Sequence, residues 1–178
     1  MANRIGARLD LAATPALTTL ARFLFAAVLL LYFWNAGVTK LGEGVAGLFQ
    51  PSMGAYTQIF PKAMEAVSYD VSQLGIFHTL VALAGTWAEF ILPALIVLGL
   101  LTRLAALGMI GFVLVQSLVD LYGHGLIDQP ATFGAWFDRI PDSAILDQRA
   151  FWMLLLLLLV LKGGGPLSLD RVLFGRRD

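Results

Sequence analysis

The sequence has no cysteine, and this absence excludes several kinds of protein at the outset. Without cysteine the chain forms no disulfide, offers no thiolate to a metal ion and has no cysteine nucleophile. The chain also lacks a dinucleotide-binding fingerprint, a P-loop and a GxSxG nucleophile elbow. Its 12 basic and 12 acidic residues balance, so we expect no basic surface for nucleic acid.

Charged residues are also scarce, while apolar residues are abundant. Of the 178 residues, 13% are charged and 58% are hydrophobic. Soluble domains contain about 25% charged and about 45–50% apolar residues. So few charges would not cover this much apolar surface in water, so we expect lipid around the chain. The length suits a single domain over residues 1–178.

Four segments are apolar and long enough to cross a bilayer, which takes about 20 residues. They are residues 17–39, 74–101, 104–122 and 143–162. The fourth reaches full length if its helix begins at an N-cap on Ser143 and ends at Gly163–Gly165. Pro93 lies inside the second span and is expected to kink that helix without breaking it. The sequence therefore predicts an all-α integral membrane four-helix bundle.

The basic residues predict how the bundle is oriented. Four spans put both termini on one side, and eight basic residues belong to that side: Arg4, Arg8, Arg22, Arg103, Lys162, Arg171, Arg176 and Arg177. The other side has four: Lys40, Lys62, Arg139 and Arg149. By the positive-inside rule both termini are cytoplasmic, and we expect a bacterial inner-membrane protein. The first apolar run is too long for a cleaved signal peptide, so we expect this helix to be retained.

Two long loops, residues 41–73 and 123–142, are expected on the outer side. The first mixes glycine and proline with apolar residues, and the second contains Phe133, Trp136 and Phe137. Aromatic residues collect at headgroup level, where short amphipathic helices also lie. We therefore expect short interfacial helices in both outer loops.

Polar residues of the spans gather toward their outer ends. They are Asn35, Thr39 and Lys40; His78 and Glu89; Gln116, Asp120 and His124; and Asp147 and Arg149. His78 and Glu89 are 11 residues apart, close to three helical turns, so they share a face with Gly85. Gln116, Asp120 and His124 are spaced by four and share another face. This pattern predicts a polar cavity that is open to the outer side and has contributions from all four spans.

Glu89 is expected at the floor of that cavity, near the middle of the membrane. A charged side chain facing lipid at this depth costs at least about 2.5–3.5 kcal/mol, so Glu89 must face the bundle interior. Dry and unpaired, it would be protonated, because burial disfavours the charged form. Two structural interpretations stand beside this one. In the first, protonated Glu89 only forms a hydrogen bond between two helices. In the second, Lys40, Asp147 and Arg149 only form ion pairs at the membrane interface.

Three stretches carry a resemblance to a known family. They are NAGVTKL at Asn35–Leu41, EFILPALIVLGLLTRLAAL at Glu89–Leu107 and GGGPLSLD at Gly163–Asp170. In order, they resemble the end of the first helix, the glutamate-to-"lGlltR" signature and the terminal "GxGxlSlD" of the DoxX family of small bacterial membrane proteins. His124 stands where many members have a histidine after the third span. The chain departs from the family in having Asn35 where a histidine is frequent, and in its long outer loops.

The resemblance implies a four-helix membrane bundle with a role linked to redox chemistry. The family is named for a subunit associated with thiosulfate:quinone oxidoreductase, and many members are described only as oxidoreductase subunits. Others accompany redox, metal-stress or thiol-stress systems. The implied protein is thus a redox-associated membrane subunit that works with a redox partner protein.

The leading hypothesis is a site for quinone in the outer half of the bundle. Glu89, Asp120 and His124 are the expected proton donors. The expected cofactor-binding residues are Asn35, Lys40, His78 and Gln116. Electrons would come from the partner protein or from a bound metal. A homo-oligomer is left open.

Two other classes of function remain as alternatives. One is a metal-handling accessory protein in which His78, His124, Glu89 and Asp120 bind the ion, although no metal-binding motif is present. The other is a non-catalytic membrane anchor of a redox complex, with the polar residues only holding the helices together.

Overall fold

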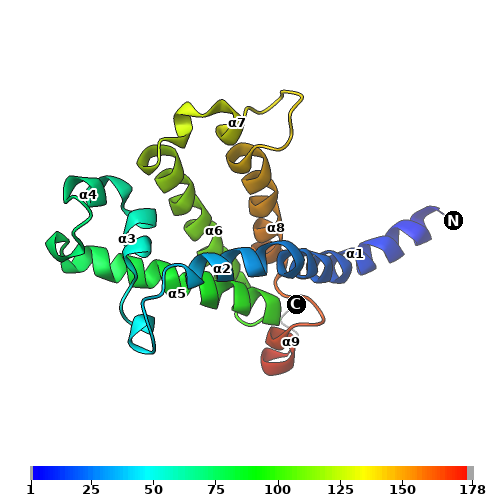
Figure 1. The fold of residues 1–178 in the computed structure, drawn as a ribbon. Helices are drawn as coiled ribbons and strands as arrows, with labels where there is room; N and C mark the ends of the chain where they lie inside the picture. Colours follow the sequence, from blue (N-terminus) through cyan, green and yellow to red (C-terminus); the bar gives the residue numbers. More distant parts are fainter. Residues whose placement is uncertain (1, 176–178) are drawn as a thin grey trace.

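The computed structural model describes residues 2–175 and the side chains of residues 13–175, and it consists of helices (Figure 1). Four of its helical segments are long and apolar enough to cross a membrane: Ala13–Val38, Ile76–Leu98, Thr102–Gly123 and Ala144–Lys162. Among the described residues no strand occurs, and one isolated bridge joins Leu41 to Pro51. The predicted all-α membrane bundle is confirmed, and the chain is a multi-pass membrane protein.

The four spans and the short helices between them follow one another along the chain. The first span comprises α1 (Ala2–Phe25), the π-helical η1 (Ala26–Leu30) and α2 (Leu31–Val38). The second is α5 (Ile76–Leu98), and the third is α6 (Thr102–Leu118) with η4 (Val119–Gly123). The fourth is η6 (Ala144–Gln148) with α8 (Arg149–Lys162), and α9 (Leu169–Phe174) follows it.

The spans associate as two pairs that diverge from a common packed end. Helix α2 packs on α5, and α6 packs on α8, while the α5–α6 hairpin joins the pairs (Figure 1). Buried side chains from all four spans meet near that hairpin, including Phe25, Ile96, Met109 and Leu156. The N-terminal half of α5 and the C-terminal half of α6 are therefore separated, which leaves room for a cavity.

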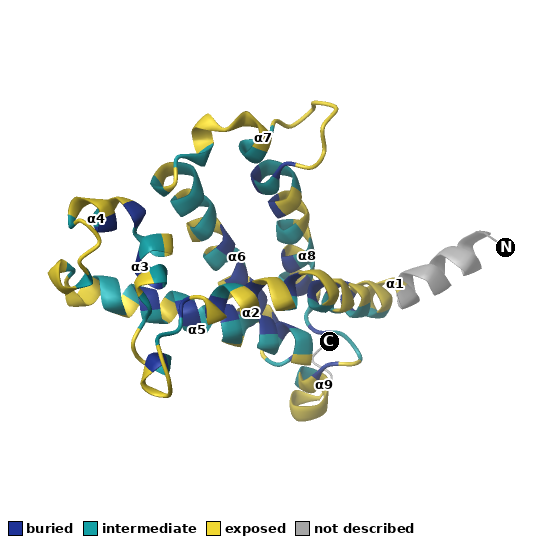
Figure 2. Ribbon diagram, viewed as in Figure 1, coloured by how far each residue is buried: buried dark blue, intermediate teal, exposed yellow. Residues whose placement is uncertain are grey.

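The outward faces of the spans are exposed (Figure 2). The large side chains exposed there are apolar, as a protein surrounded by lipid requires. The side chains of Phe23, Leu31, Leu104, Phe151 and Leu154 are each 63–68% exposed. Exposed apolar residues repeat along every span, so most sides of the bundle are covered by apolar side chains.

The expected start of the fourth span is confirmed. Ser143 is the N-cap of η6, and its Oγ accepts a hydrogen bond from the Asp147 backbone N at 3.2 Å. Asp147 Oδ2 in turn accepts from the Ser143 backbone N at 2.9 Å. This reciprocal pair satisfies amide groups that a helix start leaves free. Pro93 lies inside α5, which continues to Leu98 without a break.

Both outer loops contain short helices, as predicted, and their depth in the membrane stays a prediction. The first loop holds η2 (Ala46–Leu48), α3 (Met53–Ile59), α4 (Pro61–Ala66) and η3 (Val71–Gln73), and the second holds η5 (Leu126–Asp128) and α7 (Pro130–Phe133). Helix α3 packs on α5, where Ala55, Tyr56 and Met64 form a small buried cluster with Ala82. This packing covers the N-terminal half of α5.

The C-terminal segment closes the packed end of the bundle. Asp170 in α9 accepts hydrogen bonds from the Leu101 and Thr102 backbone N atoms at 2.6 and 2.9 Å and from Thr102 Oγ1 at 2.7 Å. It thereby caps the first turn of α6, where a carboxylate also suits the helix dipole. The turn between the second and third spans is thus held by a residue almost 70 positions away.

The first span begins and the fourth span ends at this end of the bundle, and its cytoplasmic location stays a prediction. Part of the charge count behind that prediction lies outside the described residues. It concerns Arg176, Arg177 and Asp178, and the side chains of Arg4, Arg8 and Asp10.

We predict that Gly99→Ala destabilises this end of the bundle by about 1–3 kcal/mol more than a change of backbone preference alone. Gly99 has φ +68°, and an added Cβ would lie 2.6 Å from Ser168 Cβ and 2.7 Å from Arg22 Cζ. The matched control is Gly44→Ala, because Gly44 has φ +61° with no atom within 4 Å of the added Cβ. In the control, only the unfavourable backbone conformation lowers the stability, by about 1–2 kcal/mol. Unfolding of both variants in detergent measures the difference, and equal losses would contradict the packing argument.

Candidate functional site

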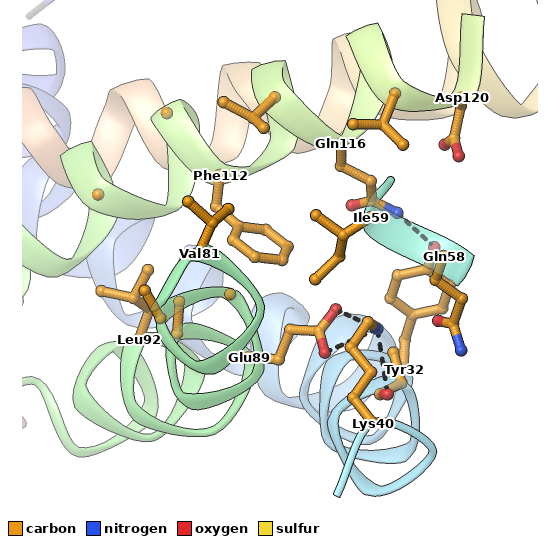
Figure 3. A pocket seen from close by; sticks show the side chains of 18 of the residues that line it. Tyr32, Lys40, Gln58, Ile59, Val81, Glu89, Leu92, Phe112, Gln116 and Asp120 are labelled. Atoms are coloured by element: carbon orange, nitrogen blue, oxygen red, sulfur yellow. Dashed lines mark hydrogen bonds and ion pairs between the residues drawn. The ribbon is translucent and has the colours of Figure 1, made fainter. Parts of the chain in front are cut away.

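A cavity of about 510 Å³ lies between α2, α3, α5 and the α6–η4 helix (Figure 3). Its size falls within the range of about 300–1,000 Å³ typical of small-molecule sites. Apolar side chains from α3, α5 and α6 form most of its wall, among them Ile59, Val81, Leu92, Phe112 and Val115. We call it the Glu89 cavity, after the carboxylate on its wall.

Lys40 and Glu89 form a buried ion pair at the edge of this cavity. Lys40 Nζ lies 2.9 Å from each carboxylate oxygen of Glu89 and 3.1 Å from the Ala36 carbonyl oxygen. Lys40 is 6% exposed and Glu89 is 4% exposed. Two charges leave water only where their attraction and further hydrogen bonds offset the desolvation. Here the lysine at the end of α2 satisfies the carboxylate in the middle of α5.

Small residues on α5 and α6 keep the cavity open. Gly85 and Ala88 line it from α5, and Gly108 and Gly111 line it from α6. A Cβ added to Gly111 would have no atom within 4 Å. Several lining residues inside the spans are exposed, including Gly111, Val115 and Tyr32. Because these positions lie at membrane depth, the cavity opens toward the surrounding lipid.

Tyr32 and Gln116 offer one free donor and one free acceptor in the same cavity. Gln116 Nε2 donates to the Tyr32 hydroxyl oxygen at 3.2 Å (Figure 3). Gln116 Oε1 is buried and has no partner among the described residues. The Tyr32 hydroxyl proton is donated to none of the described residues either. Unpaired buried polar atoms are costly, so a ligand that pairs with them would be favoured.

Asp120 lines the cavity from η4 and is held there by the fourth span. Arg149 donates to Asp120 Oδ2 at 2.5 Å and to Ser117 Oγ at 2.8 Å. Arg149 is 7% exposed, so this second ion pair is also largely removed from solvent. The fourth span thus fixes a cavity residue without lining the cavity itself.

His124 closes the end of the cavity nearest the loops. Its Nε2 lies 3.0 Å from the Gln58 backbone carbonyl oxygen in α3. A carbonyl only accepts hydrogen bonds, so this contact requires a proton on Nε2. The contact joins η4 to α3 across the mouth of the cavity.

Five of the seven predicted site residues line the cavity, and two do not. The five are Lys40, Glu89, Gln116, Asp120 and His124. Asn35 is exposed and lies outside the lining. His78 packs between Phe60 and Phe77, with ring centroids 4.8 and 5.9 Å away. Residues at the α3–α4 junction cover His78, so helical spacing alone did not bring it to the cavity.

The cavity also differs from the predicted one in composition. The prediction of a polar cavity lined by all four spans is wrong, because its walls are mainly apolar and α8 lines none of it. Glu89 is not unpaired, so the condition for a protonated lone carboxyl is not met. The signal for its partner was present in the sequence. An intramembrane carboxylate needs a counter-ion, and Lys40 directly follows the first span.

The contribution of Tyr32 and Gly111 was missed for a different reason. A tyrosine or a glycine in a membrane helix is normally interpreted as a residue that packs against a neighbouring helix. Only the relative rotation of α2, α5 and α6 gives these residues a common cavity.

Metal binding gains no support from the geometry. Across residues 13–175, no three His, Cys, Asp or Glu side chains come close enough together to hold a metal ion. Asp120 and His124, two of the four predicted ligands, contact Arg149 and the Gln58 carbonyl instead.

The fold and the buried site define a helical multi-pass membrane protein with an intramembrane cavity. The family model for DoxX matches residues 17–119, more than half of the chain. The chain belongs to the DoxX family. Neither the curated proteins nor the solved structures contain a match to it. The matched region includes Lys40, Glu89 and Gln116, and it ends one residue before Asp120.

Proposed function

We propose that this protein binds a lipid-soluble quinone in the Glu89 cavity, as a subunit of a redox system in the bacterial inner membrane. The observation that carries the proposal is the buried Lys40–Glu89 pair beside an apolar cavity that opens at membrane depth. An ion pair that faced lipid on all sides would cost too much desolvation free energy. An ion pair that only held helices together would need no cavity beside it. A redox role for the family is suggested by resemblance alone, so the site must carry the argument.

The chemistry of the cavity suits a quinone. A quinone has a flat ring with two carbonyl oxygens and an apolar tail. The Tyr32 hydroxyl is free to donate to a ring oxygen, and Gln116 Oε1 is free to accept from a ring hydroxyl. Phe112, Val115 and Leu92 supply apolar contact for the ring, and the exposed Gly111 region leaves an exit for the tail.

The charged residues would handle protons in this arrangement. Conversion of a quinone to the hydroquinone takes up two electrons and two protons. A redox partner protein supplies the electrons. The Lys40–Glu89 ion pair at the edge of the cavity would supply a proton to the ring, while Asp120 and His124 lie at the end nearest the loops, where protons would enter from water.

The proposal predicts that Gly111→Phe weakens quinone binding without unfolding the protein. The new ring fills the cavity from a position where no atom lies within 4 Å of the added Cβ. The measurement is quenching of tryptophan fluorescence by a short-chain ubiquinone added to the detergent-purified protein. We expect at least about a tenfold weaker apparent affinity, equivalent to about 1.4 kcal/mol, because the new ring occupies space that the quinone needs.

Leu118→Phe is the matched control. Leu118 lies on the same helix, is 56% exposed and does not line the cavity. This variant should bind the quinone as the wild type does. Equal affinity in all three proteins, with all three folded, would contradict quinone binding in the Glu89 cavity and would favour the membrane-anchor alternative.

A further inference from the structure

A second cavity, of about 730 Å³, lies at the opposite end of the bundle. It is formed where the spans begin and end, between the first turn of α6, the end of α8, the glycine loop at 163–165 and α9. We call it the Arg103 cavity. Nothing in the proposed quinone chemistry uses it.

Positive charge dominates the lining of the Arg103 cavity. Arg103, Lys162 and Arg171 line it from three different helices, α6, α8 and α9. No described residue forms an ion pair or a hydrogen bond with the charged group of any of the three. The lining has one acidic side chain, Asp170, and both of its oxygens already accept hydrogen bonds from Leu101 and Thr102. Among the described residues of the lining, the three cations therefore outnumber the single carboxylate, and none of them pairs with it.

The glycine loop adds uncharged donors to the same cavity. The backbone N–H groups of Gly164 and Gly165 donate to none of the described residues. Their carbonyl oxygens are in use, since Gly164 accepts from Arg22 and Gly165 accepts from Ser168 Oγ. The loop thus offers two free backbone donors to a ligand in the cavity. Free donors beside unpaired cations are what a phosphoryl group requires.

The location of the cavity indicates which kind of molecule would carry the phosphoryl group. The spans start or stop at Ala13, Leu98, Thr102 and Lys162, so the cavity lies at headgroup level. Leu104 lines it as well and is 66% exposed toward the bilayer side of α6. A soluble phosphate would use only the charged part. A phospholipid would also place its acyl chains along the apolar part.

We infer that the Arg103 cavity binds the phosphate of an anionic phospholipid, with Arg103, Lys162 and Arg171 as its cationic ligands. Bound there, the lipid bridges α6, α8 and α9 and fixes the C-terminal segment that caps α6. Basic pockets between membrane helices bind anionic headgroups by the same combination of charge and depth. The inference does not depend on the Glu89 cavity or on quinone.

The test is native mass spectrometry of the detergent-purified protein, titrated with phosphatidylglycerol or with phosphatidylcholine. The wild type should retain one phosphatidylglycerol in preference to phosphatidylcholine. Arg103→Gln/Lys162→Gln should weaken phosphatidylglycerol binding by roughly 25-fold, about fivefold for each cation removed. Both side chains are exposed and make no bond to a described residue, so the variant should fold.

Lys62→Gln/Arg139→Gln is the control with the same change of charge at exposed positions outside the cavity. It should bind phosphatidylglycerol as the wild type does. An equal loss in both double variants, or equal binding of the two lipids, would overturn the inference. Displacement of the lipid by millimolar inorganic phosphate would also overturn it, because the site would then hold a free anion. If the double variant unfolds, Lys162→Gln alone must still show the fivefold loss.

Discussion

Replacing Lys40 with methionine should cost the protein about 3–5 kcal/mol of folding free energy. The substitution removes one member of a buried pair and leaves Glu89 without its two 2.9 Å contacts. Loss of one partner from a buried ion pair typically has this effect, because Glu89 must then either stay charged without a partner or take up a proton, and both cost free energy. Glu89 is 4% exposed, so water gives it little help. Unfolding in detergent, followed by circular dichroism, measures the loss.

The double variant Lys40→Met/Glu89→Leu separates charge pairing from packing. Two apolar residues of similar volume leave no unpaired charge, so we expect stability to return to within about 1–2 kcal/mol of the wild type. The same variant should not bind the quinone, because the charged edge of the cavity is gone. If the double variant were as unstable as Lys40→Met, the ion pair would not be the source of the loss.

Arg22→Gln should be the second large loss, again about 3–5 kcal/mol. Arg22 donates to the carbonyl oxygens of Ile96, Gly164 and Leu167 at 3.0, 3.1 and 2.6 Å, and to that of Val97. These bonds tie the first span to the end of α5 and to the loop after α8. Hydrogen bonds to a charged group contribute about 1.5–3 kcal/mol each, and they are not additive here because one side chain makes all four.

Arg139→Gln is the matched control for this substitution. Arg139 is exposed and its side chain bonds to no described residue, so its loss should change stability by less than about 0.5 kcal/mol. The stability of Arg22→Lys should lie between those of the two variants, because lysine keeps the positive charge but lacks the planar set of donors of the guanidinium group. An Arg22→Gln variant as stable as the control would contradict the role of Arg22 as the tie between these segments.

The residues of the resemblance motifs meet at two different places in the molecule. Lys40 and Glu89 meet at the cavity. Gly99, Thr102 and Asp170 meet at the packed end, where the carboxylate caps α6 and the glycine allows close approach of the C-terminal segment. The "lGlltR" and "GxGxlSlD" stretches are therefore parts of one structural joint, and the glutamate is the part that reaches the candidate site.

The spans were predictable because membrane helices are determined mainly by length and apolar content. Each expected span agrees with the structure to within four residues at either end. Ser143 was identified as the N-cap because the short apolar core needed a start with a hydroxyl side chain. Short helices in the outer loops followed from composition.

The cavity was only partly predictable because it depends on how the helices rotate and cross. Periodicity correctly grouped Gln116, Asp120 and His124 on one face of the third span. It also grouped His78 with Glu89, and there the Phe60 ring intervened. The pairing of Glu89 with Lys40 joins residues 49 positions apart, and helical spacing within a single span carries no information about it.

The most direct test of the account is photoaffinity labelling of the wild-type protein in lipid nanodiscs with an azido-quinone, followed by peptide mapping. Quinone bound in the Glu89 cavity should label residues 84–92 of α5 and 108–119 of the third span. The Lys40→Met/Glu89→Leu variant should lose that labelling. Labelling spread over lipid-facing residues such as Phe23, Leu104 and Phe151, and unchanged in the variant, would contradict the account.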